Sequence, residues 1–551
     1  MAKVKKINVA DLITLFIVII IVAINIYAFK NKLIRLFNDF FYGNIEITTL
    51  TEKQKIEDFD YLYNRITNGI PQSSLNEFEQ LYGISFKDNY DKYKELVIKT
   101  KSDAEYYCAM KEIMADLPSF HTDIVFPKYS VYENLDCYNS NNVLNTKYIK
   151  QKSEYWNNVL LNECNDYSSI RDSSDKFIYT NGSYVNENGY SLIEIDNYDA
   201  NEFILNQMST INLKYDYINK QAYRESFIVH KTPRDNSSDE IKYKVLNKDG
   251  GISEQIGYLD SVSEWVYRYG HNFDKDYHFK TYVTDNSVYN FDDNENEVCY
   301  LMLNTMYGDC AMVPEIVSDS LYDTVILDIR NNTGGYEYGV ANYVYPPLFV
   351  ENIVQNKEWY FPDVFDIKQI LWLENFQNRP RVKFSSYNYS NQMLNTFDKS
   401  YITAQKTLEF NGAATSNKKV YLLISDGTGS AADGFAALLK ENNLATLIGS
   451  NTGGEGLADS FMMDSLPNSG LVFIYTYSIA FGCDGLNNSV YGTSPDVYVN
   501  ISVDGFNKSS EMKKSGQDPY TYENRLKWDD VLIKTLEIIK EKENVEWPTT
   551  A

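Results

Sequence analysis

The sequence has few of the residues that mark a metal-dependent or nucleic-acid-binding protein. Its four histidines show no His-Glu-x-x-His spacing, which argues against a zinc protease. Its six cysteines are scattered without a Cys-x-x-Cys pair, which argues against a zinc ribbon or a thioredoxin-type redox site. The 51 basic residues are outnumbered by 76 acidic ones, giving a net charge of −25. Such a chain repels phosphates, so nucleic acid is not an expected partner.

Long apolar runs are also scarce, and residues 12–29 are the one candidate for a transmembrane helix. At about 1.5 Å per residue this run reaches roughly 27 Å, just enough to cross a bilayer core. A cleaved signal peptide is the alternative, but its apolar region would be shorter and no clear small-x-small cleavage site follows. We therefore predict an uncleaved anchor after a tail of residues 1–11. Lysines flank the run on both sides, so the positive-inside rule leaves its orientation open.

The length of 551 residues predicts more than one domain. After a connector at 30–50, residues 51–128 read as an N-terminal helical region and residues 129–248 as a β-rich insert. Residues 249–541 alternate strand and helix, which predicts an α/β core. An aromatic-rich insert at 350–418 interrupts this core and is either a lid or substrate wall, or a structural flap.

Residues 425–433 carry the clearest candidate for chemistry. They follow an apolar run and precede an amphipathic one, which predicts a strand, a tight turn and a helix. Ser430 falls at the helix start, where backbone N–H groups lack partners. Two interpretations remain open: Ser430 is a nucleophile with the Ala431 N–H facing an oxyanion, or Ser430 and Asp433 form an ordinary helix cap.

Residues 323–335 form a second informative segment. A strand of β-branched residues and leucine runs into the pair Gly334-Gly335. Paired glycines can present backbone N–H groups in a concave nest that suits an anion. The two segments together are more specific than either alone.

Together they resemble the tail-specific (C-terminal processing) serine peptidases and their tricorn-like relatives. The matching positions are Asp328, Arg330, Asn332, Gly334 and Gly335 at a strand end, Ser430–Asp433 at a helix start, Gly449, Thr452 and Gly454 in a turn, and Gly492, Pro495 and Asp496 at a later strand entry. The resemblance implies a crotonase/ClpP-like core, a polypeptide substrate, no metal or cofactor, and a usual exported location. It therefore places residues 1–11 in the cytoplasm and the catalytic domain outside the cell.

The resemblance also bears on the general base. One branch of the family uses a lysine in the turn after the serine helix, and that position is Glu455 here. The tricorn-like branch uses a histidine in a Leu-x-x-x-His-Thr/Ser context, which residues 117–122 match, so His121 is the expected base. The glutamate expected as third member corresponds to Ser489. Ser489, Asp484, Glu455 or a water remain candidates to orient the imidazole.

The resulting prediction is a membrane-anchored, extracytoplasmic serine endopeptidase that works through an acyl-enzyme. Ser430 attacks, His121 carries the proton, and Ala431 with Gly334 or Gly335 holds the oxyanion. The alternatives are a degraded peptidase-fold module that binds a peptide or hydrophobic ligand, and a cell-surface scaffold. Residues 189–200 are similar to a run in the PDZ-like module of this family, so the β-rich insert either captures peptides by strand addition or only packs.

Overall fold

The computed structural model describes residues 49–117, 119, 121–127, 147–163, 170–173, 177–186, 188–206, 212–224, 228–230, 240–261, 288–362, 382–385, 401–458 and 461–543. The predicted anchor at 12–29 and nearly all of the connector at 30–50 lie outside the described residues. Within the described ranges, no helix combines the length and the apolar character that crossing a bilayer requires.

Helices dominate the N-terminal part of the described chain. They are α3 (Glu52–Gly69), α4 (Gln72–Tyr82), α5 (Tyr90–Ile98), α6 (Asp103–Ala115) and α8 (Lys147–Glu163). Side chains fix two of the starts: Thr51 and Gln54 form a capping box on α3, and Ser102 accepts the Glu105 N–H at α6. Every residue of α6 is buried, so this helix is the centre of the bundle. Helix α8 lies within the region 129–248 that the sequence predicts to be β-rich, and its buried Trp156 donates to the Ser469 carbonyl at 2.8 Å.

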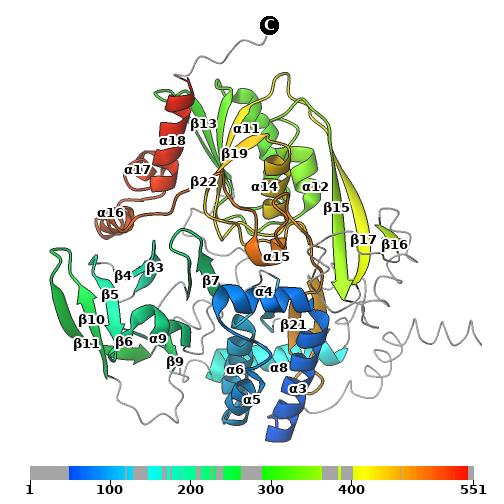
Figure 1. Ribbon diagram of the computed structural model, residues 1–551, viewed down its shortest axis with the longest axis vertical. Coiled ribbons are helices and arrows are strands. Elements are labelled where there is room, and N and C mark those ends of the chain that lie inside the picture. Colours follow the sequence, from blue (N-terminus) through cyan, green and yellow to red (C-terminus); the bar gives the residue numbers. More distant parts are fainter. Residues whose placement is uncertain are drawn as a thin grey trace, which may run out of the picture.

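A β-rich unit follows along the chain. Its largest sheet has the order β3-β4-β5-β10-β11-β2-β9, with β6 paired to β5. The strands are β2 (Ile170–Ser173), β3 (Ile178–Thr180), β4 (Ser183–Val185), β5 (Ser191–Ile195), β6 (Tyr198–Asp199), β9 (Ile228–His230), β10 (Glu240–Leu246) and β11 (Ile252–Ser261). Helix α9 (Ala200–Asn206) packs on this sheet, and β7 (Leu213–Asp216) pairs with β8 (Gln221–Arg224). Figure 1 shows the unit beside the helical bundle.

The α/β core is built on a six-stranded sheet in the order β12-β13-β14-β18-β19-β22. The strands are β12 (Val288–Asp293), β13 (Val298–Leu303), β14 (Thr324–Asp328), β18 (Lys419–Ile424), β19 (Ala445–Gly449) and β22 (Val497–Tyr498). All neighbours are parallel except β12 and β13. Parallel strands need cover on both faces, which explains why every residue of β14 is buried.

Helices supply that cover. On one face lie α14 (Ala431–Glu441), α11 (Val313–Asp319) and the short turns η2 (Gly308–Met312), α12 (Glu337–Gly339) and η3 (Val340–Val344). On the other lie α17 (Tyr522–Arg525) and α18 (Asp530–Glu543), preceded by α16 (Val503–Lys514). The strand, tight turn and helix predicted around residues 425–433 are confirmed as β18 and α14, and β19 pairs parallel to β18.

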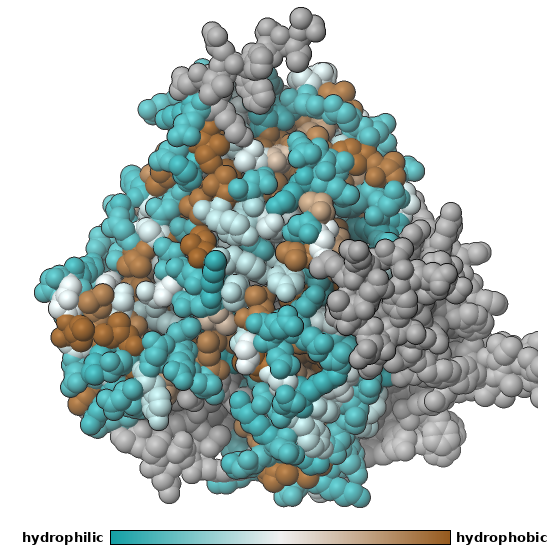
Figure 2. Space-filling model, in the orientation of Figure 1, coloured by the Kyte–Doolittle hydropathy of each residue, from teal (hydrophilic) through white to brown (hydrophobic). Residues whose placement is uncertain are grey.

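Two further sheets complete the fold. The insert contains β15 (Ile353–Pro362), β16 (Val382–Ser385) and β17 (Tyr401–Phe410), a sheet that extends to one side of the core in Figure 1. The other sheet joins β1 (Asp123–Ile124), just after the helical bundle, to β20 (Phe461–Ser465) and β21 (Val472–Thr476). A short helix, α15 (Asn488–Tyr491), lies above α4. The face drawn in Figure 2 is mostly hydrophilic, in keeping with the charged composition.

Candidate active site

Ser430 stands on a turn that the core sheet holds in place. The turn leaves β18, and three of its residues bond to the chain leaving β14: the Ser425 hydroxyl donates to the Arg330 carbonyl, the Thr428 hydroxyl to the Ile329 carbonyl, and the Gly429 N–H to the Asn332 carbonyl. At Ser430 the backbone adopts φ 51° and ψ −127°. A positive φ is strained for a residue with a Cβ and is common at functional sites.

The helix-cap interpretation of Ser430 and Asp433 is wrong. Although Ser430 occupies the N-cap position of α14, its side chain accepts no cap hydrogen bond from the described residues. The buried Asp433 carboxylate instead accepts from the hydroxyls of Thr452 (2.5 Å) and Thr493 (2.6 Å) and from the Gly456 N–H (2.8 Å). Asp433 therefore fixes the turns around the helix start, and the Ser430 hydroxyl is left for another role.

The glycine pair predicted to hold an oxyanion lies against Ser430. A Cβ added to Gly334 would come within 2.6 Å of the Ser430 Cβ and 2.9 Å of the Ala431 nitrogen. The Gly334 N–H is engaged with the Asn332 side chain at 2.9 Å, whereas the N–H groups of Gly335 and Ala431 have no acceptor among the described residues. Of the two glycines considered, Gly335 is thus the available donor, and Gly334 provides the close approach.

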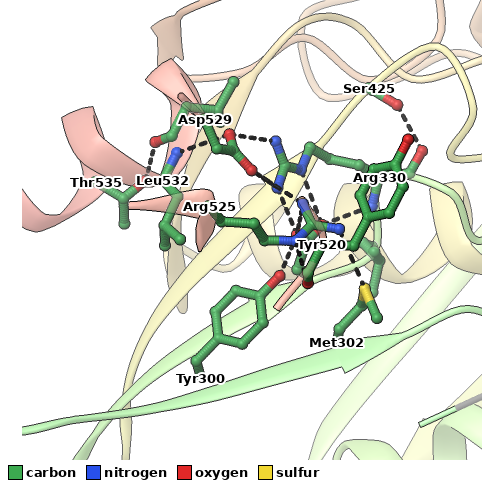
Figure 3. Close-up of polar contacts among 12 residues, drawn as sticks. Tyr300, Met302, Arg330, Ser425, Tyr520, Arg525, Asp529, Leu532 and Thr535 are labelled. Carbon is green, nitrogen blue, oxygen red and sulfur yellow. Dashed lines mark hydrogen bonds and ion pairs between the residues drawn. The ribbon is translucent and has the colours of Figure 1, made fainter. Parts of the chain in front are cut away.

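A buried ion-pair network supports this glycine turn (Figure 3). Arg330 bonds to Asp529 through Nη1 (2.8 Å) and Nη2 (2.7 Å), and its Nη2 also reaches Asp328 at 2.6 Å. Arg525 adds a second cation at 3.0 Å from Asp529. Although burial opposes it, the guanidinium of Arg330 holds the pKa of Asp328 well below its usual range. The motif residues Asp328 and Arg330 therefore anchor the strand end to α17 and α18.

His121 lies on a turn after α6, closed by a hydrogen bond from the Thr122 N–H to the Ser119 carbonyl (3.2 Å). The Thr122 hydroxyl oxygen accepts the Thr476 N–H at 3.3 Å, which fixes the turn to β21. The imidazole ring meets the Phe461 ring edge-on with centroids 5.4 Å apart. His121 Nδ1 is buried, and burial lowers the pKa of His121 to about 4, so the ring is neutral near pH 7.

Glu455 is a buried carboxylate that contacts the His121 turn and lies next to the Ser430 turn in the structure. It follows Gly454, whose carbonyl accepts the Ser430 N–H at 2.9 Å. Its Oε1 accepts the hydroxyls of Ser119 and Thr476, each at 2.5 Å, and its Oε2 accepts the Ser489 hydroxyl at 3.1 Å. Burial raises the pKa of Glu455 to about 7.

The structure thus brings together Ser430, Gly335, Ala431, Glu455 and Ser489, with His121 on a turn bonded to the same network. Asp484 lies on an exposed turn, where it accepts the Leu486 N–H, outside the Glu455 hydrogen bonds of the described residues. In the part of the chain that the structure describes, no cluster of three or more metal-ligating side chains occurs.

Sequence reasoning missed three supporting residues. Ser119 and Thr476 meet at Glu455, with 2.9 Å between their hydroxyl oxygens. Lys357 of β15 donates to the Gly456 carbonyl at 2.6 Å and to Glu337 at 2.7 Å, which ties the insert to the turn beside Glu455. Only Ser119 had a local signal, because it lies two residues before the predicted base.

Residues 297–499 match the family model described as Peptidase family S41. Mature CPAF is similar in fold: it is 13% identical over 90% of this chain and 99% of its own, with a TM-score of 0.51. CPAF complexed with lactacystin gives 14% identity over 89% and 99%, with a TM-score of 0.50. The photosystem II D1 C-terminal processing protease matches 82% of this chain and 93% of its own at 14% identity, with a TM-score of 0.33. A search of curated proteins gave no match.

The matched region contains Ser430, the glycine pair, Glu455 and Ser489, whereas His121 lies before it. The mixed α/β fold and the expected peptidase class are both confirmed. The chain therefore carries a domain of peptidase family S41, the family of serine peptidases that its sequence motifs indicate.

Proposed function

We propose that the protein is an endopeptidase that cleaves polypeptides through an acyl-enzyme on Ser430. The observation that carries this proposal is the position of Ser430: a positive φ at a helix start, no cap hydrogen bond within the described chain, and Gly334 packed against its Cβ. A side chain held in this way is presented to a ligand instead of to its own helix.

In the proposed reaction the Ser430 Oγ attacks the scissile carbonyl carbon while His121 accepts the hydroxyl proton. The N–H groups of Gly335 and Ala431 stabilise the oxyanion that forms. His121 then gives the proton to the leaving amine, and the C–N bond breaks. Water attacks the acyl-enzyme by the same route and releases the new carboxyl terminus. A neutral imidazole near pH 7 suits the role of base.

We also propose the arrangement around the catalytic core. Residues 12–29 anchor the chain in the cell membrane, with residues 1–11 in the cytoplasm and the peptidase core outside. The core is of the crotonase/ClpP-like type, and the β-rich unit is PDZ-like, taking an extended peptide along a strand edge. The apolar run and the strand pattern at 189–195 support these finer assignments.

Replacing the nucleophile tests the proposed chemistry. Ser430→Ala should abolish hydrolysis of fluorescein-labelled casein, whereas Ser318→Ala, on an exposed face of α11, should leave it unchanged. Both variants should keep the melting temperature of the parent. Full activity in a folded Ser430→Ala protein would exclude Ser430 as nucleophile, and an inactive parent that binds peptide would favour the degraded module.

A further inference from the structure

Glu455 is a carboxylate buried without a cation. Glu455 is 3% exposed, and within the described part of the chain no lysine or arginine forms an ion pair with its carboxylate. Three hydroxyl groups surround it, from Ser119, Thr476 and Ser489. A buried carboxylate is costly, so a site that keeps one is a candidate for function.

The hydroxyl groups connect Glu455 to the predicted base. Ser119 opens the turn in which His121 is the third residue, and Thr122 closes it. Glu455 accepts a hydrogen bond from the Ser119 hydroxyl at 2.5 Å, and the Thr476 N–H donates to the Thr122 hydroxyl oxygen at the other end of the turn. The position of His121 therefore depends on the position of the Glu455 carboxylate.

The backbone beside Glu455 connects it to the predicted nucleophile. The carbonyl of Gly454 accepts the Ser430 N–H, and the N–H of Gly456 donates to Asp433 on the first turn of α14. Glu455 itself adopts φ 68°, a strained value that these bonds on either side maintain. One residue thus links the turn of His121 to the turn of Ser430.

We propose that Glu455 is the positioning residue of this site: it holds the His121 turn through Ser119 and, as an anion, stabilises the imidazolium formed when His121 takes the Ser430 proton. This inference rests on the proposed function. Ser489, which the sequence presents as a candidate third catalytic residue, then supports Glu455 by donating a hydrogen bond to its Oε2. The family pattern expects a glutamate at the position of Ser489, and in this chain the carboxylate of the site is supplied by Glu455 instead.

The charges around Glu455 give the inference a measurable signature. Asp433 of α14 faces it and opposes its ionisation, whereas Lys357 of β15 is engaged with the Gly456 carbonyl and Glu337, and His121 is the titratable group of the adjoining turn. Burial sets the pKa of Glu455 at about 7 and that of His121 at about 4. Between these values both groups are neutral, and above about pH 7 Glu455 becomes the anion. Activity should therefore rise with the ionisation of Glu455.

The experiment is the pH dependence of kcat/KM for casein hydrolysis, measured from pH 5 to 9 on the parent and on Glu455→Gln. The parent should rise with a midpoint near 7. The variant should lose at least about tenfold of its plateau and lose the midpoint near 7, because a neutral amide cannot stabilise the imidazolium. An unchanged midpoint with activity within about threefold of the parent would overturn the inference.

A second variant covers the case in which Glu455→Gln does not fold. Ser119→Ala removes only the hydroxyl between Glu455 and the His121 turn. It should lower kcat about fivefold or more with little change in KM, and it should move the midpoint upward, because Glu455 still ionises but has lost a hydrogen bond that lowers its pKa. Unchanged kcat in Ser119→Ala would contradict the coupling. If the parent itself does not hydrolyse casein, the proposed function fails; if the parent is active and both variants match it, only this inference fails.

Discussion

Gly334→Ala should disable the site without unfolding the protein. The new Cβ would lie 2.6 Å from the Ser430 Cβ and 2.9 Å from both the Ala431 nitrogen and the Gly429 carbonyl oxygen. Carbon atoms pack at about 3.5–4 Å, so the two turns must separate by about 1 Å. A displacement of this size costs about 100-fold in rate, because it moves Ser430 relative to the N–H groups of Gly335 and Ala431. We expect kcat/KM to fall by at least about 100-fold.

Gly83→Ala is the matched control for this substitution. Gly83 ends α4 with φ 73°, and an added Cβ there meets nothing within 4 Å. Both variants place alanine at a positive φ, which costs on the order of 1 kcal/mol of unfolding free energy, and Gly334→Ala adds the cost of its steric overlap. Only Gly334→Ala should lose hydrolysis of labelled casein. A folded Gly334→Ala protein with activity within about threefold of the parent would refute the proposed contact between the glycine turn and Ser430.

Three further predictions concern stability and location. Asp529→Ala should lower the free energy of unfolding in urea by about 3–5 kcal/mol, because it leaves Arg330 buried without a main partner, whereas Lys534→Ala at an exposed pair should cost less than about 1 kcal/mol. The free energy of unfolding of Glu455→Gln, relative to that of the parent, should increase by about 3 kcal/mol as pH rises from 4.5 to above 7. The pKa of Glu455 is raised in the folded state, so the parent loses stability through that window, whereas the variant has no carboxyl group to titrate at this position. A melting difference independent of pH would contradict this. Protease added to intact cells should digest residues beyond 50; complete protection, with digestion in lysed cells, would exclude the proposed topology.

Local sequence patterns were sufficient to predict the framework of the core. The strand, turn and helix around Ser430 and the strand leading to Gly334 follow from apolar periodicity and glycine placement, and they are present as β18, α14 and β14. The helix α8 was not predicted, because its sequence is rich in polar residues and tyrosine. Its Trp156 becomes a core residue only through contact with segments such as Ser469, far along the chain.

The details of the site could not be read from the sequence for a similar reason. A serine at a helix start looks the same whether it caps the helix or not, and the distinction lies in a backbone angle and in the partners of Asp433. The group around Glu455 comes from four separate segments, contributing Ser119, Glu455, Thr476 and Ser489. No spacing rule relates them, since they meet only after the helical bundle packs against β21.

Covalent labelling with a fluorophosphonate probe tests the central claim most directly, because the probe reports an activated serine hydroxyl. Mass spectrometry of the labelled parent should find the adduct on Ser430. Ser430→Ala should abolish labelling, and His121→Ala should slow it by about 1,000-fold or more, because nucleophile and base act as a unit. Absence of an adduct on Ser430 in the folded parent, or labelling of His121→Ala at the rate of the parent, would contradict the account.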